Sequence, residues 1–468
     1  MHKLTVRALA ALLCCAAVLV SAGGAPAAPA ARRLQVSPDG RFLLKEDGSP
    51  FFYLGDTAWE LFHRLGREEA DGYLRDRAAK GFTVIQAVVL AEFGGLDVPN
   101  AYGHLPLEEK DPARPNEAYF RHVDYVVERA RGLGLYVGML PTWGDKWNKR
   151  WGVGPEIFTP ENAERYGEFL GRRYRGAPVI WILGGDRSPE SETHLAIVRA
   201  MAKGLKKGDG GGHLMTYHPM GGGSSSHWFH QDDWLDFNMF QSGHGAKDAP
   251  NYEYTTADYR LAPVKPTLDG EPRYEDHPVD WKPEKGWFDD FDVRQAAYWS
   301  LLSGACGHTY GNHNVWQMWQ PGRDPISSAR TPWREALSQP GAAQMGHVRR
   351  LFESRPFLKL VPDQTLLAVD SDRKAGDMRA ARAADGSFAF VYTPEGKTLV
   401  VSRRKLKAGA VRAYWYNPRD GVGTLIGRFD GDSTGEFRPP TSGRGQDWVL
   451  VLDDESRGFP PPGAKKKR

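Results

Sequence analysis

The chain has 468 residues, of which 41% are hydrophobic and 25% charged, as expected for a globular protein with room for more than one domain. The 61 Lys and Arg residues nearly balance the 58 Asp and Glu residues, which leaves a net charge of +3. This balance gives no support to a nucleic-acid partner or to an anionic membrane surface. The basic end of the chain, Lys465 to Arg468, is interpreted as a solvated tail.

The first 30 residues have the order of a secretory signal peptide. Two basic residues precede an apolar stretch, Ala8 to Val20, and small residues follow it. The stretch is shorter than the roughly 20 residues of a membrane-spanning helix. Cleavage would remove Cys14 and Cys15 and leave only Cys306. We therefore expect a secreted protein without disulfides and without stable membrane insertion.

Apolar runs alternate with helical patterns through the middle of the chain. The predicted strands are Phe51–Gly55, Phe82–Val89, Tyr136–Leu140, Val179–Leu183, Leu214–Tyr217, Phe237–Phe240, Pro266–Leu268 and Gly307–Tyr310. The predicted helices between them are Arg67–Lys80, Glu117–Leu133, Glu161–Tyr174, Glu192–Lys206 and Asp292–Leu302. Such alternation indicates parallel βαβ units, and eight of them fit an α/β fold of the (β/α)₈ TIM-barrel type. An open doubly wound sheet is the alternative, but it usually carries a glycine-rich phosphate loop where this sequence reads Gly55-Asp56-Thr57-Ala58-Trp59.

Short strands separated by turn signals replace this pattern from about residue 360. They are predicted at Thr365–Val369, Arg379–Arg382, Ser387–Tyr392, Thr398–Val401, Val411–Tyr416, Gly423–Arg428 and Asp447–Leu452. This pattern is typical of a small antiparallel β-sandwich. We therefore predict a signal peptide over residues 1–30, a barrel over 31–359, a sandwich over 360–455 and a basic tail over 456–468.

Long polar connections follow several of the predicted barrel strands. They cover residues 91–116, 143–159, 218–235 and 273–291. In a barrel, the loops after the strands gather at the face where active sites form. The run Gly221 to Ser226 inside the third connection is therefore interpreted as a mobile active-site loop rather than as a linker between domains.

Two carboxylic acids follow predicted strands on opposite sides of the barrel mouth. Asp186 ends the fourth strand, after Gly184 and Gly185, and Glu271 ends the seventh. Glycoside hydrolysis uses such a pair, because one acid protonates the leaving oxygen while the other attacks the anomeric carbon or activates water. The two glycines are predicted to leave room for a sugar close to the backbone.

Other roles for these acids stay open at this point. Asp186 could be a metal ligand, close an Asx turn or cap a helix, and Glu271 could form an ion pair with Arg187 or Arg273. Both arginines would favour ionised carboxylates nearby, which suits a nucleophile and opposes an acid unless Asp186 is desolvated.

Further polar and aromatic residues near the strand ends are candidates for sugar binding. The predicted set is Asp56, Gln86, Glu92, Trp143, Asp145, Arg187, His218, Gln241, His244, Tyr274, Tyr310, Asn312 and Trp316. The acids among them could equally form ion pairs within loops. Histidines gather between His213 and His313, but no His-Glu-x-x-His pattern occurs, and no phosphate-loop or dinucleotide fingerprint is present. We expect neither a metal nor a cofactor.

Several motifs together resemble the apiosidase-like glycoside hydrolases, glycoside hydrolase family 140. They are Phe52–Glu60, Gly81–Gln86, Pro141–Lys146, Ile180–Arg187 and Asp269–Pro272, and the resemblance extends over residues 33–455. Tyr414–Arg419 resembles a motif of the collagen-binding-type β-sandwich that follows the barrel in these proteins. Gly185 and Asp186 depart from the Asn-Glu pair usual in the wider clan of retaining barrel glycosidases.

The resemblance implies cleavage of a terminal apiose from a pectic side chain, with Asp186 as acid/base and Glu271 as nucleophile. The expected partner is thus an oligosaccharide or polysaccharide from a plant or a microbe, and the oligomeric state is left open. Two other functions stay possible at this point. One is a non-catalytic protein that binds polysaccharide or matrix. The other is an inverting, endo-acting hydrolase that uses Asp145 or Glu92.

Overall fold

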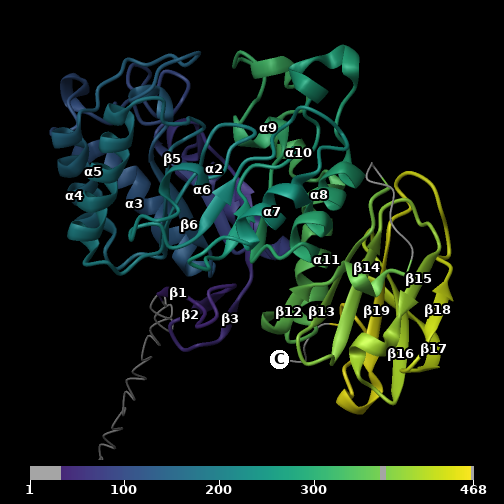
Figure 1. The fold of residues 1–468 in the computed structure, drawn as a ribbon. Coiled ribbons are helices and arrows are strands. Elements are labelled where there is room, and N and C mark those ends of the chain that lie inside the picture. The colour runs from purple at the N-terminus through teal and green to yellow at the C-terminus, as the bar shows by residue number, and fades with distance from the viewer. Residues whose placement is uncertain (1–32, 369–375, 465–468) are drawn as a thin grey trace, which may run out of the picture. The chain divides into compact units, whose positions relative to one another are not determined.

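The computed structural model describes residues 33–368 and 376–464 (Figure 1). The predicted signal peptide, the last residue of the predicted strand Thr365–Val369, and Lys465 to Arg468 lie outside the described residues. Within the described part of the chain, no helix combines the length and the apolar character needed to cross a membrane.

A small antiparallel sheet precedes the barrel. Its strands are β1 (Leu34–Val36), β2 (Leu43–Lys45) and β3 (Pro50–Phe51), paired in that order. This sheet was not predicted from the sequence, because strands of two or three residues carry too little periodicity to be recognised.

Eight parallel strands form the barrel. They are β4 (Tyr53–Thr57), β5 (Val84–Leu90), β6 (Tyr136–Thr142), β7 (Val179–Leu183), β8 (Met215–Tyr217), β9 (Asn238–Phe240), β10 (Thr267–Asp269) and β11 (Gly307–Tyr310). They pair in the order β8-β7-β6-β5-β4-β11-β10-β9. The first and last strands of this order also meet, since the backbone N–H of Asp236 donates to the carbonyl of Met215 at 2.9 Å. The predicted (β/α)₈ fold is confirmed, and each predicted barrel strand overlaps an observed one.

The helices accompany these strands as predicted. They are α1 (Leu61–Arg64), α2 (Arg67–Lys80), α3 (Glu117–Gly132), α4 (Pro160–Tyr174), α5 (Glu192–Asp209), α6 (Ser226–Phe229), α7 (Asn251–Tyr259), α8 (Asp290–Leu302), α9 (His313–Trp316), α10 (Trp333–Ala336) and α11 (Pro340–Glu353). Helix α8 begins two residues earlier than predicted because the Asp289 carboxylate caps it, accepting from the backbone N–H of Asp292 at 3.2 Å.

Helices α4 and α5 precede and follow β7 in the sequence. Glycines allow these two helices to pack closely against each other. A Cβ atom on Gly204 would lie 2.0 Å from the carbonyl oxygen of Glu164, and one on Gly171 would lie 2.4 Å from that of Leu205. Only glycine permits this approach. The close pair braces the helix–strand–helix unit whose strand leads to Asp186.

The C-terminal part contains two antiparallel sheets. Their strands are β12 (Leu360–Pro362), β13 (Arg379–Ala383), β14 (Phe388–Thr393), β15 (Leu399–Ser402), β16 (Ala410–Asn417), β17 (Val422–Asp430), β18 (Thr434–Phe437) and β19 (Trp448–Asp454). Six pair in the order β12-β13-β14-β19-β16-β17, and β15 pairs with β18. A hydrophobic core that includes Val391, Val401 and Trp415 draws residues from both sheets. The predicted β-sandwich is confirmed.

One predicted strand of the sandwich is wrong and two observed strands were missed. The chain around Thr365 forms a short 3₁₀ turn, because the Asp363 carboxylate accepts from the backbone N–H of Thr365 at 3.1 Å. Strands β12 and β18 were not predicted.

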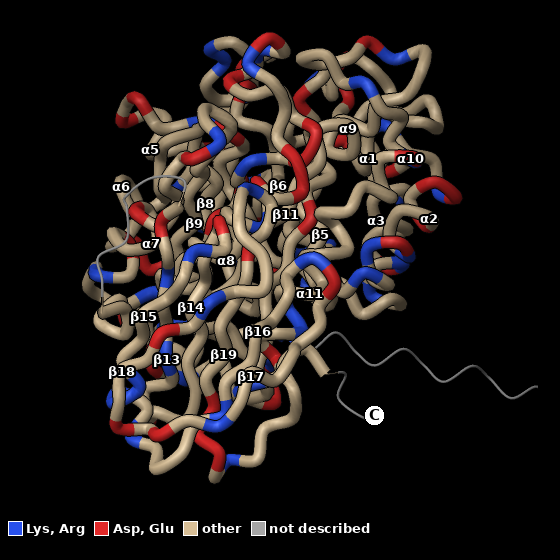
Figure 2. Tube along the Cα trace, turned by 90° about the vertical axis from the view of Figure 1, so that its right-hand side faces the viewer, with Lys and Arg blue, Asp and Glu red and all other residues tan. Residues whose placement is uncertain are grey.

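Acidic and basic residues are interspersed along the chain (Figure 2), in agreement with the balanced net charge.

Candidate active site

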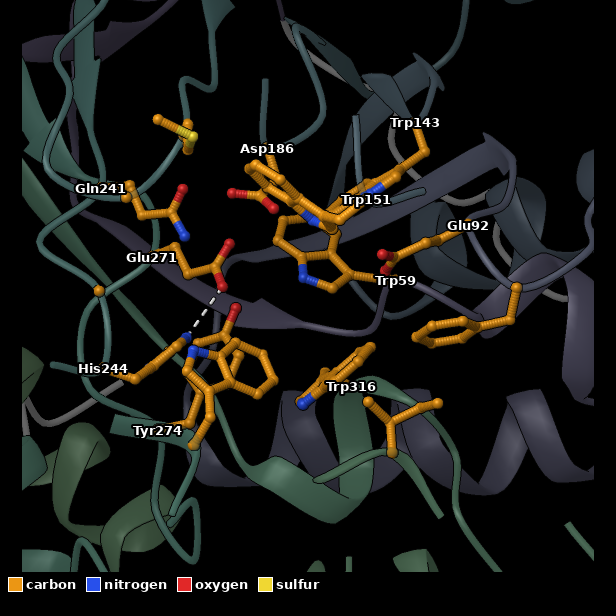
Figure 3. A pocket seen from close by; sticks show the side chains of 16 residues that line it. Trp59, Glu92, Trp143, Trp151, Asp186, Gln241, His244, Glu271, Tyr274 and Trp316 are labelled. Atoms are coloured by element: carbon orange, nitrogen blue, oxygen red, sulfur yellow. Dashed lines mark hydrogen bonds and ion pairs between the residues drawn. The ribbon is translucent and has the colours of Figure 1, made fainter. Parts of the chain in front are cut away.

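A cavity of about 570 Å³ opens where the barrel strands end. It is lined by Trp59, Glu92, Phe93, Trp143, Trp151, Asp186, Met220, Gly221, Gln241, Gly243, His244, Glu271, Tyr274, Trp281, Trp316 and Ile326. Asp186 follows β7 and Glu271 follows β10, the fourth and seventh barrel strands. Figure 3 shows both carboxyl groups turned towards this cavity.

The backbone before Asp186 is unusual. Gly184, Gly185 and Asp186 have φ values of +101°, +72° and +57°. A Cβ atom on Gly184 would lie 2.2 Å from the carbonyl oxygen of His218, and one on Gly185 would lie 2.7 Å from the backbone nitrogen of Gly144. The prediction that these glycines leave room for a sugar is therefore wrong, because neighbouring protein backbone fills that space.

Replacing Gly184 with Ala should lower the free energy of unfolding by about 3 kcal/mol or more. The added methyl group meets the His218 carbonyl, and alanine is strained at a φ of +101°. Urea denaturation of the variant measures this loss. Gly176→Ala is the matched control, since a Cβ atom there meets nothing within 4 Å. Equal stability of the two variants would contradict the explanation.

Two histidines hold the Glu271 carboxylate. His244 Nε2 lies 3.0 Å from Oε1, and His218 Nε2 lies 3.1 Å from Oε2. His218 Nδ1 accepts a hydrogen bond from the backbone N–H of Asp186 at 3.2 Å, which assigns the ring proton to the Nε2 that faces Glu271. Burial alone would raise the pKa of Glu271, but the contacts with His218 and His244 outweigh it and lower that pKa to about 2.

Asp186 is shifted in the opposite direction. Burial, followed by the negative charge of Glu271, raises the pKa of Asp186 to about 7, against the opposing effects of His218, Arg187 and a hydrogen bond with Gln241. The cavity therefore holds an ionised Glu271 beside an Asp186 that is about half protonated near neutral pH. Two carboxyl groups whose pKa values are driven apart in this way can serve as nucleophile and acid.

Arg187 contacts Asp186 without keeping it ionised. Its Nη1 donates to the backbone oxygen of Asp186 at 2.7 Å and lies 3.3 Å from Oδ2, while its Nε donates to the carbonyl of Asn148 at 3.0 Å. The guanidinium is thus shared with backbone carbonyls, and its effect on the carboxyl is smaller than that of burial. Asp186 does not cap the following helix, since that role belongs to Ser191.

One interpretation of the sequence allowed an ion pair between Glu271 and Arg187 or Arg273. Among the described residues, no arginine pairs with Glu271. Both of its oxygens contact histidines. Arg273 instead donates to the carbonyls of Lys247 and Ala249, at 2.8 and 3.1 Å.

The structure brings part of the predicted sugar-binding set together at the cavity. The members that line it are Glu92, Trp143, Gln241, His244, Tyr274 and Trp316. Arg187 and His218 lie behind this lining and contact Asp186 and Glu271. These eight residues keep their candidate role.

Two of the predicted acids form ion pairs away from the cavity lining. Asp56 accepts from Arg77 Nε at 2.6 Å, and both side chains are buried. Asp145 pairs with Lys146 at 2.7 Å and accepts from the backbone N–H of Gly154 at 2.8 Å. The sequence left open an ion pair within a loop for both acids. Asp145 forms one with its neighbour after β6, whereas Asp56 at the end of β4 pairs with Arg77 of α2.

Gln86, Tyr310 and Asn312 are also absent from the lining. Gln86 Nε2 donates to the carbonyl of Gly270 at 3.0 Å inside the barrel, and the Tyr310 hydroxyl donates to Glu275 at 2.5 Å. Asn312 caps the start of α9. Each of these side chains forms hydrogen bonds within the protein and lies outside the cavity lining. This geometry does not support the predicted contacts with substrate.

Half of the cavity lining was not proposed from the sequence as catalytic or sugar-binding residues. These residues are Trp59, Phe93, Trp151, Met220, Gly221, Gly243, Trp281 and Ile326, and among them Gly221 begins the run that was interpreted as an active-site loop. Most of them lie in the long loops after barrel strands, and Trp59 lies just beyond β4. The position of these residues in loops after barrel strands was the only feature of the sequence that could have indicated a place at the cavity.

Two family models match this chain. Residues 37–359 match the family model described as "Apiosidase-like, catalytic domain", and residues 361–453 match the one described as "Putative collagen-binding domain of a collagenase". The comparison with curated proteins found no match.

Two solved structures are similar over most of the chain. One, named "Glycoside hydrolase", is 33% identical with a TM-score of 0.83, and the alignment covers 91% of this chain and 97% of that one. The other is a glycoside hydrolase family 5 protein from Bacteroides vulgatus ATCC 8482, which is 32% identical with a TM-score of 0.84, covering 91% and 93%. The barrel and these relatives define a glycoside hydrolase. Since the first family model matches more than half of the sequence, the chain belongs to the apiosidase-like family.

Proposed function

We propose that the protein is a secreted glycosidase that removes a terminal apiose from a pectic polysaccharide by a retaining mechanism. Asp186 is the acid/base and Glu271 the nucleophile. The observation that carries this proposal is the opposite shift of the two pKa values within one cavity, to about 7 and about 2. The description of the family model supports apiose as the sugar.

In the first step, Glu271 attacks the anomeric carbon while Asp186 gives its proton to the glycosidic oxygen. The bond between that carbon and oxygen breaks, the leaving group departs as an alcohol, and the sugar is esterified to Glu271. His218 and His244 hold the Glu271 oxygens, so the nucleophile needs little rearrangement to react.

In the second step, the Asp186 carboxylate takes a proton from water, whose oxygen attacks the anomeric carbon and releases Glu271. Esterification has by then removed the Glu271 charge that helps to raise the pKa of Asp186. The pKa of Asp186 is therefore lower at this stage, so the side chain stays ionised after giving up its proton. As a carboxylate it can then act as the base.

Glu92 and Gln241 are proposed as polar contacts for the sugar. No hydrogen bond or ion pair engages the Glu92 carboxyl within the described residues. Burial, followed by the charges of Asp186 and Glu60, raises its pKa well above the usual value. A carboxyl in the cavity lining accepts hydrogen bonds from sugar hydroxyls, and a raised pKa favours the protonated form, which can also donate one.

Between pH 3 and pH 10, kcat/KM should be highest on the acid side and fall along an alkaline limb near pH 7. Activity needs Asp186 protonated, so it falls as pH rises through about 7, and it needs Glu271 ionised, so it falls as pH drops towards about 2. Initial rates of apiose release from pH 3 to pH 10 measure the profile. Activity that still increases above pH 8 would contradict the assignment of the acid.

The decisive experiment incubates the purified chain with apiose-bearing pectic fragments and with a panel of other glycans. Chromatography identifies the released sugar, and proton NMR of the first product identifies its anomeric configuration. Release of apiose with retained configuration supports the proposal. Inverted configuration would exclude Glu271 as nucleophile, and binding without release would favour the polysaccharide-binding alternative.

A further inference from the structure

Two tryptophans at the cavity are strongly exposed. Trp151 is 56% exposed and Trp281 48%, whereas Trp59, Trp143 and Trp316 in the same lining are at most 4% exposed. Tryptophan side chains are mostly buried in folded proteins. The three buried indoles thus form inner walls of the cavity, and the two exposed ones stand at its rim.

Trp151 is fixed in place beside the proposed acid. The guanidinium of Arg187 lies over its ring at 4.1 Å, and the same guanidinium bonds the backbone oxygen of Asp186. Neighbouring Gly152 packs tightly, since a Cβ atom there would lie 2.2 Å from Cβ of Asp145. Asp145, predicted from sequence as a sugar contact, instead anchors this loop through the N–H of Gly154.

Trp281 is held in a comparable way beside the proposed nucleophile. Its ring packs edge-on against His277 at 4.4 Å and against His244 at 5.7 Å. Its backbone N–H donates to the carbonyl of Pro278 at 3.1 Å, and the preceding residue donates to the carbonyl of His244 at 2.8 Å. A fixed, exposed indole is a low-entropy surface for stacking.

Beneath the two carboxyl groups the barrel is closed. Gln86 Nε2 donates to the carbonyl of Gly270 at 3.0 Å and the Tyr53 hydroxyl donates to Gln86 Oε1 at 3.1 Å, which fills the interior. A leaving group that receives its proton from Asp186 must therefore extend outwards, past the rim where Trp151 stands.

We propose that Trp151 and Trp281 form a subsite for a sugar ring of the leaving group. Trp151, whose ring also lies 5.2 Å from the guanidinium of Arg150, presents its exposed indole to the apolar C–H face of that sugar, and Trp281 bounds the sugar on the side of Glu271. This inference rests on the proposed function and extends it, because it assigns two residues to the recognition of the sugar ring next to the scissile bond.

The test compares kcat/KM for an apiosyl disaccharide with that for methyl apioside, whose leaving group carries no ring. Trp151→Ala and Trp281→Ala should each lower the value for the disaccharide about tenfold, and the value for methyl apioside by no more than about threefold. Trp151→Phe keeps a ring beside Arg187 and should stay within about threefold of wild type on both substrates. Val153→Ala is the matched control, since Val153 is 52% exposed in the same loop but does not line the cavity.

Equal losses on the two substrates would overturn the inference, because the tryptophans would then act only by positioning Arg187 and His244. Unchanged activity on the disaccharide would overturn it as well. Both outcomes leave the proposed function intact. A wild-type protein that releases apiose from neither substrate would contradict the proposed function itself, and the subsite with it.

Discussion

Replacing Glu271 with Gln is expected to lower kcat for glycoside hydrolysis at least about a thousandfold. The amide cannot form the glycosyl ester, and the second step then has no intermediate to hydrolyse. The substitution conserves shape, so the far-ultraviolet circular dichroism and the thermal midpoint should stay close to those of wild type. Stopped assays of sugar release over hours measure the residual rate.

The matched control is Glu275→Gln. Glu275 is also a buried carboxyl that follows β10, but it accepts from the Tyr310 hydroxyl and does not line the cavity. Its substitution should leave kcat of the folded protein within about threefold of wild type. A Glu271→Gln variant that keeps a similar rate would remove Glu271 from the mechanism.

Replacing Asp186 with Asn is expected to produce a loss that depends on the leaving group. A sugar leaving group needs a proton as the bond breaks, so its release should slow at least about a thousandfold. A nitrophenolate departs without protonation, so formation of the glycosyl-enzyme from a nitrophenyl glycoside should slow far less. Single-turnover kinetics with both kinds of substrate measure the first step separately.

The Glu271→Gln variant provides the comparison for this experiment, because loss of the nucleophile should slow both substrates to a similar extent. With the sugar leaving group, the alkaline limb near pH 7 should be present in the wild-type profile and absent from that of Asp186→Asn, since the group whose pKa is about 7 has been removed. Equal losses of Asp186→Asn on both substrates would exclude Asp186 as the acid.

Local patterns determined the barrel and the candidate pair. Runs such as Val179–Leu183 are apolar throughout because parallel barrel strands are buried on both faces, and they stand out from the helices between them. Counting these runs made Asp186 the end of the fourth strand and Glu271 the end of the seventh, which the structure reproduces. Parallel strands put all their carboxyl ends at one face, so strand order was enough to bring the two acids to one mouth.

Only the tertiary structure decided what surrounds those acids. The partners of Glu271 are His218 and His244, which follow two other strands, and no spacing in the chain relates the three residues. Burial raises the pKa of Asp186, although the adjacent Arg187 lowers it. How deeply a side chain is buried cannot be read from its neighbours in the sequence. The exposed faces of Trp151 and Trp281 likewise depend on loops whose positions are set by contacts between distant residues. The sequence by itself thus determined which strands end in acids, while packing across the barrel decided that the pKa of Glu271 is lowered and that of Asp186 is raised.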